Sequence, residues 1–407
     1  MQKKLLIHIG FGKTGTSSLQ RFFVLNREKL QSLGFYYPIA GREDLNAHHY
    51  MATAVRPGGG TGFDTDVSWE AYLQRLADEL EKRHEPTVLI SSEIFSGRVI
   101  FGKLHKLLAL FSEVQVVSYL RRQDILAVSS YNQWVKTEHL TKKFSDLKML
   151  PFYYERILDM WQTTFSASGS INVNIVRPYE RGQLYKGDVL DDFMHNILGA
   201  ELDDTYFYPE KSEENLSLSL DTLEYKRIVN GFCPADIAND ILNPLLMYTR
   251  NDLTAGKELL SSQQRRDLLA HYAEGNTVVA SRYMGRTDGV LFYDAEPSDD
   301  PEWAEHTLTL GKAIDISRYI LHMKYPGEEA HNVYEIICKA LKFKWFTAEL
   351  PEDEKVLAFN EGVQGINANG SEISEKIESV IRACVYNIYG KFADKLEDDL
   401  IAIRWAK

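Results

Sequence analysis

A short glycine-rich segment near the start of the chain carries the residue types that bind a phosphate or sulfate group. It reads Gly10-Phe11-Gly12-Lys13-Thr14-Gly15-Thr16-Ser17-Ser18 and lies between an apolar run, residues 5–9, and helically spaced apolar residues from Leu19 onward. Glycines let the backbone approach a ligand closely, and the first N–H groups of a following helix attract an anion. The Lys13 ammonium adds a full charge, and the hydroxyl groups add donors. The segment predicts an anion-binding turn, with a simple helix-capping turn as the alternative.

The spacing of this segment differs from the loop of nucleoside triphosphatases, G-x-x-x-x-G-K-[ST]. Gly12-Lys13-Thr14 matches the end of that pattern, but its first glycine would fall at Ile7. The predicted strands 87–91 and 114–119 are not followed by an Asp that would hold Mg²⁺. The pattern therefore disfavours an ATP-dependent P-loop kinase, which stays open as an alternative, and we expect no metal site.

The loop closely resembles a known family element. Gly12-Lys13-Thr14-Gly15-Thr16-Ser17-Ser18 is similar to the 5′-phosphosulfate loop of sulfotransferases, commonly written P-K-[ST]-G-[ST]-[ST], with Gly12 in place of the proline. A second element of that family is a strand followed by an arginine, with a serine eight residues later. Arg121 and Ser129 match it here. The resemblance covers about residues 1–200 and comes from two motifs in the family's order.

The resemblance implies an activity and a donor. The donor is 3′-phosphoadenosine-5′-phosphosulfate (PAPS), which leaves as adenosine 3′,5′-bisphosphate (PAP) after its sulfuryl group moves to a hydroxyl or amine. Family members hold the 5′-phosphosulfate in the loop, and its 3′-phosphate with the arginine and serine. That role falls here on Arg121 and Ser129, with Arg122 and Ser130 as near alternatives.

Sulfuryl transfer needs a base to take the acceptor's proton and a positive group at the leaving phosphate. Lys13 suits the second role. Glu93 directly follows the predicted strand 87–91, where cytosolic sulfotransferases carry a catalytic histidine. His48 and His49 are the alternatives, because an imidazole titrates near neutrality and glycan-modifying members place a base in this stretch. We rank Glu93 first and His48 second, against structural roles for each: an ion-paired or capping glutamate, and a core or exposed histidine.

Strand and helix patterns alternate through the first half of the chain. Strands are predicted at residues 5–9, 87–91, 114–119 and 171–176, with helical spacing between them. This alternation predicts an α/β fold, a three-layer parallel sheet with a P-loop-like turn, and a mainly helical C-terminal region. We expect a PAPS-binding core at 1–200, a helical continuation that covers the acceptor or cofactor at 201–300, and a helical extension at 301–407.

Composition narrows the function classes. The 407 residues carry a net charge of −12, which argues against a general nucleic-acid binder but not against a pocket for a small anion. The three scattered cysteines predict a reducing compartment, and no apolar run approaches the roughly 20 residues of a membrane span. We therefore expect a cytoplasmic sulfotransferase with a small-molecule or glycan acceptor. A nucleotide-binding protein without catalysis is the alternative from another class, and the sequence leaves the acceptor and the oligomeric state open.

Overall fold

The computed structural model describes residues 3–58, 62–147, 150–168, 171–209, 216–250, 252, 258–301, 303–324 and 370–389. Contacts divide the chain into two compact units that alternate along the sequence. The first comprises Met1–Ala127, Leu150–Lys211 and Ser262–Asp299, and the second comprises Val128–Met149, Ser212–Ser261 and Asp300–Lys407. The division of the sequence at residues 200 and 300 stays a prediction about function.

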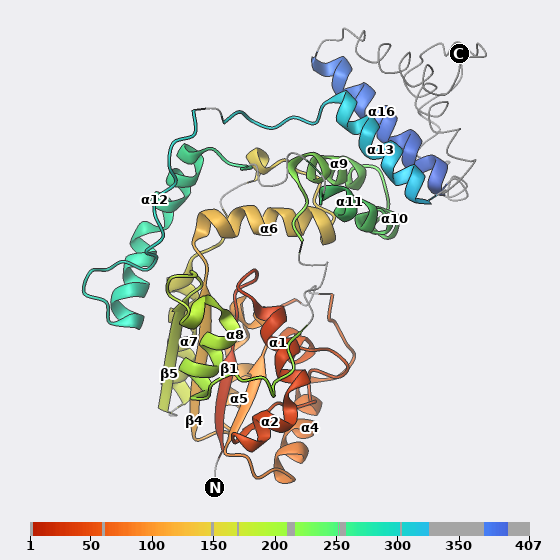
Figure 1. Ribbon diagram of the computed structural model, residues 1–407. Helices are drawn as coiled ribbons and strands as arrows, with labels where there is room; N and C mark the ends of the chain where they lie inside the picture. The colour runs from red at the N-terminus through yellow and green to blue at the C-terminus, as the bar shows by residue number, and fades with distance from the viewer. Residues whose placement is uncertain are drawn as a thin grey trace, which may run out of the picture. The chain divides into compact units, whose positions relative to one another are not determined.

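The first unit is built on a parallel sheet, as the sequence predicted (Figure 1). The strand order is β2-β3-β1-β4-β5. The strands are β1 (Lys4–His8), β2 (Phe35–Tyr36), β3 (Thr87–Ser91), β4 (Glu113–Leu120) and β5 (Ile171–Pro178). Apolar residues fill both faces of the central strands, which is typical of a parallel sheet covered on both sides.

The register of the central strands places three chain segments at one edge of the sheet. His8, the last residue of β1, is level with Ser91 at the end of β3 and with Val117 in β4. All three strands run in the same direction, so the residues that follow them emerge at the same edge. This is the carboxyl edge, where ligands of open α/β folds bind.

Helices cover both faces of this sheet and make three layers (Figure 1). Leu5 and Ile7 face a cluster formed by α3 (His49–Ala54), α4 (Trp69–Glu81), α5 (Phe101–Leu108) and α7 (Tyr154–Ser168). Leu6 faces the other cluster, formed by α1 (Thr16–Leu25), α2 (Arg27–Ser32) and α8 (Val189–Phe193). The first unit also contains α12 (Ser262–Val278), which ends in the π-helical turn Val279–Tyr283.

One predicted helix is divided in two. The apolar spacing from Leu19 to Leu33 indicates a single helix, but α1 and α2 meet at Asn26. The Asn26 amide donates to the Phe207 carbonyl and accepts from the Phe207 N–H, each at 2.8 Å. A partner 181 residues away therefore fixes the break.

The second unit is helical, as predicted. Most of α6 (Gln123–Thr137) belongs to it, together with α9 (Leu220–Asn230), α10 (Ala235–Asp240), α11 (Leu242–Thr249), α13 (Leu310–Lys324) and α16 (Gly370–Tyr389). These helices share one apolar core, in which α13 and α16 lie side by side (Figure 1). Short turns complete the described elements: η1 (Glu93–Ser96), η2 (Phe144–Asp146), η3 (Tyr185–Gly187) and η4 (Met194–Leu198). Within the described residues, no helix is both long and apolar enough to cross a bilayer.

Candidate functional site at the carboxyl edge of the sheet

The glycine-rich loop joins β1 to α1 and turns through left-handed backbone conformations. Gly10, Lys13 and Gly15 have φ of 35°, 67° and 78°. A Cβ on Gly15 would lie 2.8 Å from Val189 Cγ1, and a Cβ on Gly10 would lie 2.5 Å from a Thr16 methyl. No atom lies within 4 Å of the corresponding point on Gly12. Glycine is therefore required at positions 10 and 15, whereas the loop is open at Gly12.

The amino end of α1 is available to an anion. Its N-cap is Gly15, which has no side chain to accept a hydrogen bond, and its first turn contains no acidic residue. The first backbone hydrogen bond joins the Leu19 N–H to the Gly15 carbonyl at 3.1 Å. The N–H groups of residues 16–18 therefore have no partner within the helix, and the positive end of the helix dipole adds to them. Ser17 is exposed and Ser18 half-buried, whereas Thr14 and Thr16 are buried.

Arg121 brings the second motif to the loop. It directly follows β4, and its Nη1 donates to the Lys13 carbonyl at 2.8 Å. Burial, and then the charge of Arg121, lower the pKa of the Lys13 ammonium. Burial also lowers the pKa of the Arg121 guanidinium, which lies 5.7 Å from the centre of the Tyr179 ring. Two partly desolvated cations at one loop favour the binding of an anion beside them.

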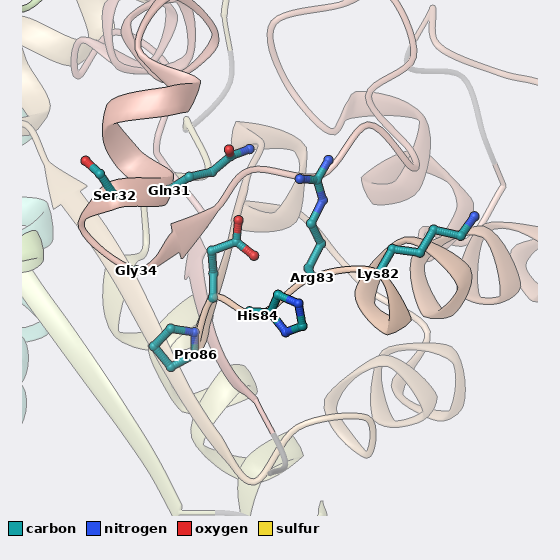
Figure 2. Close-up of a pocket in the computed structure, with 8 residues that line it drawn as sticks. Gln31, Ser32, Gly34, Lys82, Arg83, His84 and Pro86 are labelled. Carbon is teal, nitrogen blue, oxygen red and sulfur yellow. The ribbon is translucent and has the colours of Figure 1, made fainter.

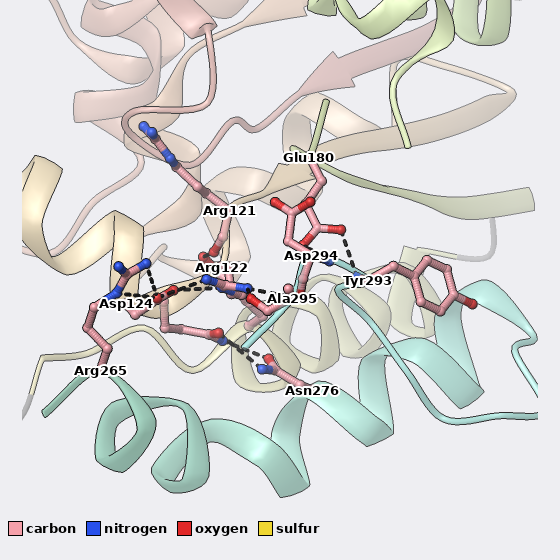
Figure 3. Close-up of polar contacts among 11 residues, drawn as sticks. Arg121, Arg122, Asp124, Glu180, Arg265, Asn276, Tyr293, Asp294 and Ala295 are labelled. Carbon is pink, nitrogen blue, oxygen red and sulfur yellow. Dashed lines mark hydrogen bonds and ion pairs between the residues drawn. The ribbon is translucent and has the colours of Figure 1, made fainter. Parts of the chain in front are cut away.

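Arg122, the neighbouring alternative, is committed to a structural network (Figure 3). Its guanidinium pairs with the fully buried Asp124 at 2.9 Å, and Arg265 donates to the same carboxylate at 2.9 Å. Arg122 also donates to the carbonyls of Asp294 and Ala295, at 3.0 and 2.8 Å. Of the two adjacent arginines, only Arg121 contacts the loop.

The buried carboxylate of Glu180 also binds residues 293–295, the segment that Arg122 contacts (Figure 3). Glu180 is 4% exposed and accepts from the N–H groups of Tyr293 and Asp294, at 2.8 and 3.2 Å. Gln123 and Asn276 exchange two amide hydrogen bonds nearby, at 2.7 and 3.0 Å. In the sequence, Glu180 can be recognised only as a charged residue that follows a predicted strand. Its partners lie more than 100 residues away, so no local pattern links them to it.

Ser129 and Ser130 lie on α6, in the part of the helix that belongs to the second unit. Ser129 is half-buried and Ser130 is 8% exposed. The role of Ser129 toward a 3′-phosphate stays a prediction.

Glu93 and His49 lie together where β3 leaves the sheet. Glu93 Oε2 accepts from Gln20 Nε2 at 2.9 Å, and Glu93 Oε1 is 3.9 Å from His49 Nε2. His49 Nδ1 lies 2.9 Å from Ser92 Oγ. Burial lowers the pKa of His49, an effect that the charge of Glu93 opposes. The pair offers a carboxylate and an imidazole side by side, which suits proton transfer.

His48 occupies a different environment. It is fully buried, its Nδ1 accepts from the Ser91 N–H at 3.2 Å, and its Nε2 lies 3.1 Å from the Pro38 carbonyl. Burial lowers the pKa of His48 to about 3. Both ring nitrogens are engaged by backbone groups, so the geometry favours Glu93 and His49 over His48 as proton acceptors.

Two residues that the sequence did not single out connect these parts. Gln20 on α1 donates to Glu93 and also lies 3.3 Å from Ser91 Oγ. His8 is fully buried below the loop, with Nδ1 2.9 Å from Ser91 Oγ, and its Nε2 has no hydrogen-bond partner among the described residues. A polar chain therefore runs from Glu93 through Gln20 and Ser91 to His8. In the sequence, His8 is one polar residue within an apolar run, which gives little indication of this position.

An open cavity of about 370 Å³ lies at the opposite edge of the sheet (Figure 2). Gly34 and Pro86, which directly precede β2 and β3, line it together with Lys82, Arg83 and His84. Glu85 also lines it beside these basic residues, and the cavity lies at the amino ends of the strands, away from the glycine-rich loop.

Comparison with known proteins gives little further guidance. The sequence matches no described protein family, and no solved structure matches it. A protein of Archaeoglobus fulgidus, described as an uncharacterized protein, is 31% identical over 216 residues, which are 51% of this chain and 57% of that protein. The chain thus spans little more than half the length of this relative, and the similarity assigns neither a family nor an activity.

Proposed function

We propose that the chain transfers a sulfuryl group from PAPS to a hydroxyl or amine acceptor. One observation carries the proposal: the Arg121 guanidinium donates to the carbonyl of Lys13. Two motifs that resemble donor-binding elements of sulfotransferases, 108 residues apart, therefore meet at one loop.

The residues at this loop fit the anionic parts of the donor. The free N–H groups at the start of α1 and the Lys13 ammonium suit the 5′-phosphosulfate, and the open backbone at Gly12 allows close approach. Arg121 is placed for a second phosphate, with Ser129 expected to assist. PAPS, when bound there, supplies an activated sulfuryl group.

The chain's own residues then have defined tasks. Glu93 accepts the proton of the acceptor hydroxyl, while Gln20 holds its carboxylate in place through Oε2. His49, beside Oε1, favours the ionised carboxylate whenever the imidazole carries a proton. Lys13 balances the negative charge left on the phosphate, and positioning supplies much of the rate enhancement, as in phosphoryl transfer.

Calorimetric titration tests the donor. We would titrate PAP without metal, and ATP with Mg²⁺, into the native chain, Lys13→Ala and the control Lys82→Ala, which removes an exposed lysine from the cavity at the opposite edge. The proposal predicts metal-independent binding of PAP that Lys13→Ala abolishes and Lys82→Ala preserves. Binding of ATP only with Mg²⁺, without binding of PAP, would overturn the proposal and favour a kinase. Binding of PAP without transfer from PAPS to any acceptor would indicate a nucleotide-binding protein without catalysis.

A further inference from the structure

Arg56 follows the helix that His49 begins, and it packs against a glycine. That helix is α3, and the point where a Gly97 Cβ would stand is 3.2 Å from Arg56 Cζ. The Ile100 N–H donates to the Val55 carbonyl at 2.6 Å, which fixes the two chain segments against each other. Gly97 therefore provides the space that the Arg56 guanidinium occupies.

The Nε of Arg56 lacks a hydrogen-bond partner among the described residues. This atom is buried, and no carboxylate of the described chain pairs with the guanidinium. By contrast, the partly buried Arg177 is paired with the Asp192 carboxylate. The side chain is half-buried, and a buried N–H without a hydrogen bond is uncommon, so Arg56 has a donor ready for an anion that the described residues do not supply.

Two short elements, α3 and η1, connect the proposed proton acceptors to Arg56 and to the glycine that Arg56 contacts. His49 begins α3 and Arg56 follows its end, while Glu93 begins η1 and Gly97 follows its end. The rise of an α-helix puts His49 about 10 Å from Arg56, and the rise of a 3₁₀ turn puts Glu93 about 8 Å from Gly97. The Phe63 ring lies 4.5 Å from the His49 ring, so an apolar surface adjoins the pair.

We propose that Arg56 binds an anionic group of the acceptor, a carboxylate or sulfate about one sugar ring away from the hydroxyl that Glu93 deprotonates. The inference rests on the proposed function, because it takes Glu93 and His49 as the acceptor side of the site. The proposal predicts that the acceptor carries both a hydroxyl and an acidic group and is about the size of a sugar acid. A bidentate guanidinium suits such a group better than a lysine would.

Binding of matched sugars tests this inference by NMR titration, with and without saturating PAP. The probes are methyl β-D-glucuronide and glucose 6-sulfate, with methyl β-D-glucoside as the neutral counterpart. We expect the native chain to bind an acidic probe at least about tenfold more tightly than the glucoside, the scale of one charge-assisted contact. Arg56→Gln should remove this preference and Arg56→Lys should keep part of it. The control Arg83→Gln alters the cavity at the opposite edge and should retain the preference.

The outcomes separate this inference from the proposed function. PAP should bind Arg56→Gln as it binds the native chain, because Arg56 takes no part in holding the donor. Loss of PAP binding by the native chain would overturn the proposed donor, while an acid preference that depends on Arg56 would still support the anion site. The inference is overturned if the native chain binds acidic and neutral probes equally or binds neither. It is also overturned if Arg56→Gln retains the preference or Arg83→Gln abolishes it.

Discussion

The Nη1 of Arg121 donates to the carbonyl oxygen of Lys13 at 2.8 Å. Lys13 has a φ of 67°, a left-handed conformation that costs a side-chain-bearing residue roughly 1 kcal/mol. The hydrogen bond from Arg121 helps to hold the loop in this shape. The same hydrogen bond holds the Arg121 guanidinium against the loop that carries the Lys13 ammonium. Arg121 therefore affects both the shape of the loop and the positive charge beside it.

Arg121→Ala and Arg122→Ala should separate ligand binding from stability. Arg121→Ala removes a cation at the loop and should weaken PAP binding by about 10- to 100-fold, the scale of one charged hydrogen bond. Arg122→Ala leaves the buried Asp124 with only Arg265, and should lower the free energy of unfolding by about 3 kcal/mol. Calorimetry and urea unfolding measure the two effects. Similar loss of PAP affinity in both variants would contradict the distinct roles of the two arginines.

Two glycine substitutions test the loop backbone. Gly15→Ala combines a φ of 78° with a contact at 2.8 Å, and should lower the free energy of unfolding by about 2 kcal/mol while impairing PAP binding. Gly12→Ala meets no neighbouring atom and should change stability by less than about 0.5 kcal/mol, with PAP binding retained. Proline at this position in the sulfotransferase pattern agrees with that expectation. Unfolding curves that rank the two variants in the reverse order would refute the loop geometry.

Much of the fold was predictable because its signals are local. The predicted strand 87–91 is β3 residue for residue, and the predicted strand 114–119 lies within β4. The break at Asn26 was not predictable from apolar spacing, and the hydrogen-bond partner that stabilises it lies far along the chain. The bounds of α7 were not predicted, although Tyr154, Leu158 and Trp161 follow helical spacing and are fully buried, so there the signal was present in the sequence.

The candidate site was predictable only in part. The loop could be found because its glycines, lysine and hydroxyls are consecutive, and Glu93 because it follows a strand. The adjacent Arg121 and Arg122 could not be distinguished, since the direction of each side chain depends on how β4 ends and what packs there. Gln20 and Arg56 were missed for a related reason: they reach the site through tertiary packing against β3 and η1, which no local pattern encodes.

Substitutions at the proposed proton acceptors should affect turnover more than donor binding. Glu93→Gln keeps the shape and the contact with Gln20 but loses the base, so we expect kcat to fall by about 100-fold or more. His49→Asn should have a smaller effect, about tenfold, because it removes a neighbour of the base. Initial rates with PAPS and an active acceptor measure both, and PAP titration checks the donor site. Full activity in Glu93→Gln, or a larger loss of kcat in His49→Asn than in Glu93→Gln, would show that Glu93 is not the base.

Buried neutral histidines should make the protein sensitive to mild acid. Burial lowers the pKa of His8 from its ordinary 6.5 to about 3, and burial is also the main cause of the same shift at His48. The unfolded chain takes up these protons near pH 6.5, whereas the folded chain does not until about pH 3. Stability is therefore complete above pH 6.5 and falls between pH 6.5 and 3, by about 1.4 kcal/mol per pH unit for each histidine.

Urea unfolding at pH 7.5, 6 and 5 should reveal this dependence. His8→Asn cannot take up the proton, so it should reduce the loss between pH 6.5 and 5 by about 1.4 kcal/mol per pH unit, whatever its stability at pH 7.5. An unchanged slope in His8→Asn would contradict the lowered pKa of His8 in the folded chain.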